Sequence, residues 1–138
     1  MKRSLLVLVM ATLFMCQSVV AQITVATNVR KDYDWNSSKK EWVLTSEDNT
    51  VNTLFEFNKD LTMVRHTTST ISSTYYIKSG KENTEQHYFE YEVVSDVGNK
   101  YTMIVDFPNN NIRFIGKYSN GTFFLVRHSI KKSWIEEG

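Results

Sequence analysis

Apolar and polar residues alternate along most of this 138-residue chain, with the two-residue period that is typical of half-buried β-strands. The clearest stretch covers residues 51–67, VNTLFEFNKDLTMVRHT. Phe55 and Phe57 share one strand face, the polar run at residues 58–60 favours a turn, and the alternation then resumes. This stretch predicts a β-hairpin, which needs further strands beside it to be stable in water.

The same alternation predicts strands on both sides of the hairpin. They cover residues 23–35, 41–45, 74–78, 87–95, 101–107, 112–118 and 122–130. Short polar turns separate the strands, and two of these turns contain a Gly beside an Asn, residues that tolerate positive φ. The Ser- and Thr-rich residues 67–73 predict a loop or an exposed edge, and residues 131–138 predict a helical turn or a frayed end.

The pattern predicts an all-β fold, because no helical period continues over a dozen residues. Eight or nine strands joined by short connections predict an antiparallel up-and-down meander, since short connections place consecutive strands side by side. Closure into a barrel removes the exposed edges of a sheet. We therefore expect a β-barrel rather than a β-sandwich.

The first 21 residues have the features of a signal peptide. Lys2 and Arg3 precede an apolar run at residues 4–15, and Ala21 provides the small residue of a cleavage site. We expect cleavage after Ala21 and either secretion or export to the periplasm. The mature protein is then a single β-barrel-like domain, residues 22–138, without an integral membrane segment.

Cys16 is the only cysteine, and it lies inside the predicted signal peptide. An acylated lipoprotein anchor at Cys16 is an alternative, but Phe14 and Met15 are bulkier than the residues that normally precede such a cysteine. The mature chain has neither a disulfide nor a thiolate ligand for a metal. Its stability must therefore come from its core, which the aromatic residues of the sequence can fill.

The balance of charge excludes two classes of partner. The full chain has 16 Lys and Arg against 15 Asp and Glu, and loss of Lys2 and Arg3 leaves a net charge of −1. A nucleic-acid-binding protein needs a basic surface to neutralise phosphates. A polybasic membrane-surface protein needs a similar excess of positive charge. We expect neither.

The residues that could carry catalysis lack the required spacing. His66, His87 and His128 are not closely paired with other ligands on one strand face, so we expect no metal site. Glu90 and Glu92 share a face, and a hydrolase that uses them or a histidine is the least favoured function. Neither a nucleophile elbow nor a phosphate-binding loop is present. We therefore expect neither an enzyme nor a cofactor.

Aromatic residues that share one face of the predicted strands are the best candidates for ligand contact. An arginine on the inner face could also pair with a ligand carboxylate, and Arg65, Arg113 and Arg127 all lie within predicted strands. The predicted ligand-binding residues are Phe55, Phe57, Arg65, Tyr91, Tyr101, Phe114 and Phe124. A barrel of about eight strands holds either a filled interior or a single small-ligand pocket, and the sequence leaves both open.

The leader, the chain length and the run of short strands with an EFNKD-type hairpin resemble the small exported lipocalin-like (calycin-type) proteins of bacteria. The Gly-x-Trp signature of lipocalins is absent, because neither Trp35 nor Trp42 has a glycine two residues before it. No binding residue is therefore transferred from that family. We expect an exported, non-enzymatic protein that binds a small apolar or amphipathic ligand. The alternative is a secreted or periplasmic protein–protein interaction module with a filled core, with residues 67–74 as its contact surface.

Overall fold

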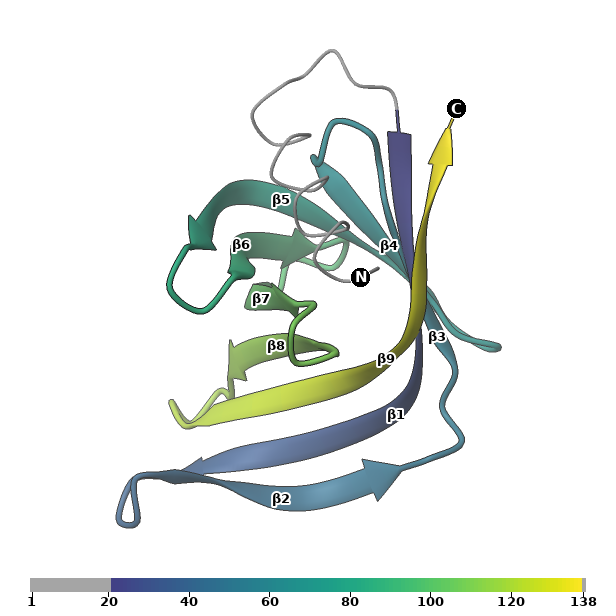
Figure 1. Ribbon diagram of the computed structural model, residues 1–138. Helices are drawn as coiled ribbons and strands as arrows, with labels where there is room; N and C mark the ends of the chain where they lie inside the picture. The colour runs from purple at the N-terminus through teal and green to yellow at the C-terminus, as the bar shows by residue number, and fades with distance from the viewer. Residues whose placement is uncertain (1–20, 138) are drawn as a thin grey trace.

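The computed structural model of the protein describes residues 21–137, whose regular secondary structure consists of β-strands (Figure 1). The strands are β1 (Ala21–Asn36), β2 (Glu41–Asp48), β3 (Thr53–Phe57), β4 (Met63–Thr67), β5 (Ser72–Asn83), β6 (Tyr88–Ser95), β7 (Lys100–Asp106), β8 (Asn111–Lys117) and β9 (Phe123–Glu137). Within residues 21–137, no helix is long and apolar enough to cross a membrane. The predicted signal peptide lies outside the described residues, apart from Ala21 at the start of β1.

All nine strands form one antiparallel sheet, in the order β2-β1-β3-β4-β5-β6-β7-β8-β9. The first and last strands of the meander also pair, since β1 bonds to β9, and this pairing closes eight strands into a barrel. The prediction of an all-β meander and of a barrel rather than a sandwich is confirmed. The closed eight-stranded barrel is compatible with a calycin-like fold.

Strand β2 lies outside the closed barrel and pairs with β1 (Figure 1). The 16-residue β1 changes its neighbour along its length. Its first part, Ile23–Thr27, pairs with β3, and its second part, Arg30–Asn36, pairs with β2. Strand β9 follows β1 along both parts. Residues 131–137 are therefore neither a helical turn nor a frayed end, because they continue β9 as a strand.

The change of neighbour coincides with two irregularities in the β1–β9 pairing. Ala26 lies opposite Lys132 and Thr27 opposite Ile130, so Lys131 is an extra residue on β9. The next pair is Val29 with Ser129, so Asn28 is an extra residue on β1. Each extra residue reverses the side of the sheet that the following residues face, and it increases the local twist.

The hairpin that was predicted at residues 51–67 is present as β3 and β4, and Asn58 orders its turn. The Asn58 side-chain oxygen accepts hydrogen bonds from the backbone amides of Thr62 at 2.9 Å and Met63 at 3.1 Å. Leu61 has a left-handed backbone with a φ of 53°, which is uncommon for a residue with a branched side chain. Burial of that side chain under the barrel compensates for the unfavourable backbone conformation.

The core lies inside the barrel and is made by alternate residues of the closed strands. Its most deeply buried members are Ile23, Val25, Phe55, Phe57, Val64, Tyr91, Val93, Met103, Val105, Phe107 and Ile112. These side chains come from β1, β3, β4, β6, β7 and β8 and from the β7–β8 turn. The alternation that predicted the strands therefore also selects the residues that fill the interior.

Candidate functional site

Seven inward-facing side chains form a group of rings at the barrel end where β1 leaves β3 for β2. We call them the histidine–aromatic cluster: Phe55, His66, Tyr75, Tyr101, Phe114, Phe124 and His128. The ring of Phe55 lies at its base, with centroid distances of 4.8 Å to His66 and 5.0 Å to His128. The two imidazoles are 5.7 Å apart, edge to face. Six strands thus contribute to one patch of the inner wall.

The two histidines reach the interior through the same short sequence. The tripeptide Val-Arg-His occurs twice, as Val64-Arg65-His66 in β4 and as Val126-Arg127-His128 in β9, and its residues face the same sides of the sheet in both strands. In each, Val and His face the interior and Arg faces outward, because side chains two residues apart share a strand face. The recurrence is the signal in the sequence that marks these histidines as a pair.

Both imidazoles are neutral at pH 7. Burial, assisted by the positive charge of Arg30, lowers the pKa of His66 to about 4. Burial, with smaller contributions from His66 and Arg30, lowers the pKa of His128 to about 3. A neutral imidazole offers one donor and one acceptor nitrogen, so each ring is suited to bind an uncharged polar group.

The polar atoms of the two histidines differ in their partners. His66 Nδ1 lies 3.3 Å from the hydroxyl oxygen of Tyr75, whose pKa is raised to about 12, chiefly by burial. His128 Nδ1 has no hydrogen-bond partner within residues 21–137, although the side chain is only 2% exposed. An unpaired buried polar atom is unfavourable, so burial of His128 Nδ1 destabilises the folded protein.

Charged residues of β1 border the cluster on its solvent side. Arg30 lies opposite His128 on β9 and opposite Asp48 on β2, so the three side chains share one face of the sheet. Its Nε donates to Asp32 Oδ1 at 2.9 Å. Asp34 accepts a hydrogen bond of 2.8 Å from the hydroxyl of Tyr118. Asp32 and Asp48 interact with the Arg30 guanidinium, and Asp34 lies further along β1, so carboxylates outnumber cations at this border and favour a neutral or cationic ligand group over an anion.

Inward-facing side chains at this end of the barrel are less buried than those that fill its interior. Tyr101 and Phe124 face inward but are only half-buried, as are His66 and Tyr75. Gly116 of β8 makes room for the rings of Tyr101 and Phe124, because a Cβ atom at Gly116 would lie 2.5 Å from Phe124 Cζ. An inward ring remains accessible only where other side chains do not cover it. The half-buried rings of His66, Tyr75, Tyr101 and Phe124 are therefore the accessible part of the cluster, whereas Phe55, Phe114 and His128 are buried beneath them.

Four of the predicted ligand-binding residues, namely Phe55, Tyr101, Phe114 and Phe124, belong to the cluster. Phe57 and Tyr91 lie deeper and contact each other, with ring centroids 6.5 Å apart. Arg65 is exposed on the outer surface. The cluster residues His66, Tyr75 and His128, and the bordering Arg30, are missing from the predicted ligand-binding residues.

The other candidates of the sequence lie on the outer face of the sheet. Arg113 forms an ion pair of 2.9 Å with Asp106, and the Arg127 guanidinium lies 5.4 Å from the ring of Tyr33. Glu90 pairs with Lys81 at 3.2 Å, and Glu92 accepts a hydrogen bond from Thr102. The Ser- and Thr-rich residues 67–74 form the β4–β5 turn and its flanks, with Ile71 at 60% exposure.

Among residues 21–137, neither imidazole of the cluster forms an ion pair or a hydrogen bond with a carboxylate. In the described part of the chain, no three His, Cys, Asp or Glu side chains lie close enough to hold a metal ion. The hydrogen-bond partner of His66 is a tyrosine rather than a carboxylate, so no residue orients it as a general base. The arrangement combines aromatic walls with neutral polar groups.

Comparisons of the chain with protein-family models, with curated proteins and with solved structures found no match.

Proposed function

We propose that the protein binds a small amphipathic ligand at the histidine–aromatic cluster. The observation that carries this proposal is the partial exposure of inward-facing rings, Tyr101 and Phe124 among them, at one end of an otherwise filled barrel. Small-ligand sites combine apolar and aromatic walls with a few polar groups that fix orientation. The cluster has both components, and the lipocalin-like resemblance of the sequence points to the same class of function.

The two parts of such a ligand would have different contacts. The apolar part packs against Tyr101, Phe114 and Phe124, which lie next to each other on β7, β8 and β9. The polar part lies near the half-buried His66, whose neutral ring can donate and accept hydrogen bonds. The excess of carboxylate at the border makes an uncharged or cationic polar group more favourable than an anionic one.

We expect residues 22–138 to bind the neutral amphipathic dye N-phenyl-1-naphthylamine and Phe124→Ala to weaken this binding about tenfold. Loss of a half-buried ring removes apolar contact of roughly 1–2 kcal/mol, which corresponds to that factor. Dye fluorescence gives the affinity, and native mass spectrometry of the untreated protein detects a ligand that co-purifies.

Phe123→Ala is the matched control, because Phe123 is the adjacent residue on β9 but faces outward and is 45% exposed. Its substitution should leave dye binding unchanged. Equal losses in the two variants, or a wild-type protein that binds no dye, would show that the cluster is not the binding site.

We further propose that the chain is exported and cleaved between Ala21 and Gln22. The proposal rests on the basic start, the apolar run and the small residue at position 21. Strand β1 would remain intact from Gln22 onward. Expression of the full chain in a Gram-negative host should yield a periplasmic or secreted protein whose mass corresponds to residues 22–138. An uncleaved cytoplasmic product would contradict export, and a product acylated at Cys16 would instead establish the lipoprotein alternative.

A further inference from the structure

The Asp34 carboxylate lies on the inner face of the sheet, beside the accessible rings of the histidine–aromatic cluster. Asp34 of β1 is directly opposite Phe124 of β9, and residues that are directly opposite in an antiparallel pair share one face. Asp34 Oδ1 accepts a hydrogen bond of 2.8 Å from the hydroxyl of Tyr118, whose ring lies 4.8 Å from that of Phe124. The Asp34 side chain is half-buried, so a ligand that contacts these rings can also reach its carboxylate.

The negative charge of Asp34 is not neutralised by a neighbouring side chain. Among residues 21–137, no Lys, Arg or His forms an ion pair with Asp34. Arg30 pairs with Asp32 instead, and it is four residues from Asp34, which is about 13 Å along a strand. Lys39 and Lys40 are exposed in the β1–β2 turn and are likewise outside ion-pair distance. The Asp34 carboxylate is therefore available to a cation from outside the chain.

The rings beside Asp34 meet at angles that suit a cation. Tyr101 and Phe124 have centroids 6.2 Å apart and planes at 73°, and the Tyr118 ring is tilted by 41° from that of Phe124. Gly116 brings two of the rings close to the backbone of β8, since a Cβ atom there would lie 2.5 Å from Phe124 Cζ and 3.0 Å from Tyr101 Cδ1. The faces of aromatic rings attract ammonium groups, and rings at steep angles to each other surround such a group from more than one side.

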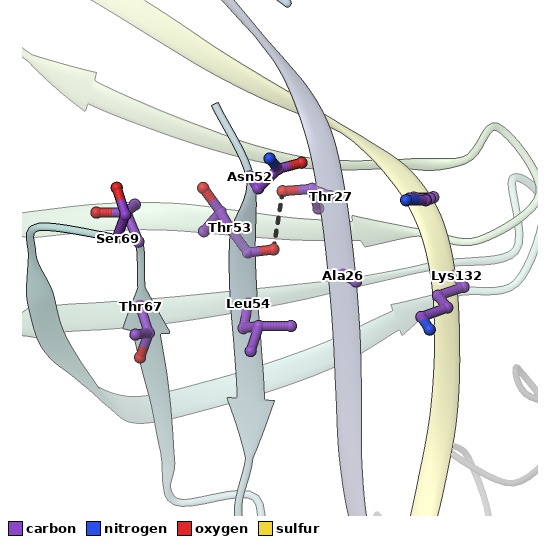
Figure 2. A pocket seen from close by; sticks show the side chains of 10 residues that line it. Ala26, Thr27, Asn52, Thr53, Leu54, Thr67, Ser69 and Lys132 are labelled. Atoms are coloured by element: carbon purple, nitrogen blue, oxygen red, sulfur yellow. Dashed lines mark hydrogen bonds between the residues drawn. The ribbon is translucent and has the colours of Figure 1, made fainter. Parts of the chain in front are cut away.

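A pocket elsewhere in the barrel wall carries charge of the opposite sign. This pocket of about 350 Å³ lies where β1 separates from β3 (Figure 2). Lys131 and Lys132 of β9 are the charged residues of its described lining, and the Lys132 ammonium group lies 5.1 Å from the ring centroid of Trp134. Two lysines oppose the approach of another cation. A cationic ligand is therefore favoured at the cluster and disfavoured at this pocket.

From these observations we infer that the ligand of the histidine–aromatic cluster is an organic cation whose ammonium group binds between Asp34 and the rings of Tyr101 and Phe124. The inference rests on the function proposed for the cluster and names the chemical class of its ligand. The apolar body of the ligand packs on the aromatic rings, and Asp34 selects an amine over an alcohol or an acid of the same shape. The carboxylate and the ring faces attract the same ammonium group, and partial exclusion of water strengthens both contacts.

Three competitors with the same phenylbutyl body test the inference at pH 7, by displacement of N-phenyl-1-naphthylamine from residues 22–138. Phenylbutylamine is cationic, phenylbutanol is neutral and phenylbutyrate is anionic. Phenylbutylamine should displace the dye at a concentration about fivefold lower than phenylbutanol, and phenylbutyrate should require the highest concentration. Phenylbutanol as effective as phenylbutylamine would overturn the inference while leaving the proposed function in place. A protein that binds no dye would instead overturn the proposed function, and this inference with it.

Substitution of Asp34 locates the selectivity. Asp34→Asn removes the charge but keeps an oxygen that can accept the hydrogen bond of Tyr118. In this variant phenylbutylamine should displace the dye no better than phenylbutanol, with circular dichroism as the check on folding.

Glu47→Gln is the matched control, because it removes the same charge from β2, where Glu47 pairs with Lys31 at 3.4 Å on the outer face. This variant should keep the preference for the amine. Equal loss of the preference in the two variants would show general electrostatic attraction and overturn the role of Asp34. A folded Asp34→Asn protein that keeps the full preference would overturn it as well.

Discussion

Replacing Phe55 with alanine is expected to lower the free energy of unfolding by about 3–5 kcal/mol, the range for large aromatic residues in protein cores. The Phe55 side chain is fully buried on the inner face of β3. It supports both histidines and also lies 5.7 Å from the ring of Phe114. Its removal leaves a cavity at the base of the histidine–aromatic cluster, and the surrounding strands are hydrogen-bonded to each other and cannot collapse fully into it. Urea denaturation at pH 7 measures the effect.

Leu54→Ala is the control for this experiment. Leu54 is the adjacent residue on β3, and it faces outward with 38% of its surface exposed. Its truncation should lower the free energy of unfolding by about 1 kcal/mol or less, because part of the side chain is already in water. Similar losses in the two variants would contradict the assignment of the inner and outer faces of β3.

Stability is expected to fall as the pH is lowered from 7 to 5, by about 2–4 kcal/mol in total. The pKa values of His66 and His128 are about 4 and about 3 in the folded protein, against an ordinary value of 6.5. Below pH 6.5 the unfolded chain binds protons that the folded protein excludes, so stability is lost as the pH falls. Each histidine contributes up to about 2 kcal/mol over this interval, and His66 contributes less because it is partly exposed.

The charged and polar groups around the two rings act in the same direction. Arg30 faces both imidazoles, so its positive charge opposes their protonation, and protonation of one ring opposes that of the other. The Asp32 carboxylate pairs with Arg30 rather than with either histidine. The Tyr75 hydroxyl, which is uncharged, lies 3.3 Å from His66 Nδ1. Phe55 and Phe114 are apolar rings that offer an imidazolium no hydrogen bond.

Urea denaturation curves between pH 7 and pH 5 measure this dependence. His128→Leu should reduce the pH dependence by roughly half, since it removes one of the two buried imidazoles. His87→Gln is the control, because His87 is exposed in the turn between β5 and β6 and its replacement should leave the slope unchanged. A wild-type protein of equal stability at pH 7 and pH 5 would rule out the burial of two neutral histidines.

Much of the fold follows from the local pattern of residues 51–67 and its repetition downstream. Phe55 and Phe57 were predicted on one face, and both are buried inside the barrel. Burial of Val64 and exposure of Leu54 show that the turn at residues 58–60 separates two strands with one inner face each. Alternation predicts such faces reliably because the pleat of a strand has a period of two residues.

The candidate site was only partly predictable, because it depends on β-bulges. A bulge reverses the sheet face of the side chains that follow it, and the alternation of apolar and polar residues does not show where a bulge occurs. Strict alternation from Ile23 places Arg30 on the outer face, together with Thr24 and Ala26. The extra residue Asn28 reverses the phase, and Arg30 instead faces His128 on the inside. A single unpaired residue moves all the following side chains to the opposite face, and a bulge leaves no clear mark in the sequence.

The local sequence predicts the class of fold, the positions of most strands and turns, and most of the residues that fill the core. These properties depend on residues that are close together in the chain, namely on alternation, turn residues and side-chain size. The tertiary structure alone decided that β1 pairs with β3 rather than only with β2, that β9 closes the barrel, and that His66 and His128 meet. These outcomes depend on which distant strands pair and in which register, and that choice is made by the packing of the whole barrel rather than by any local stretch of the chain.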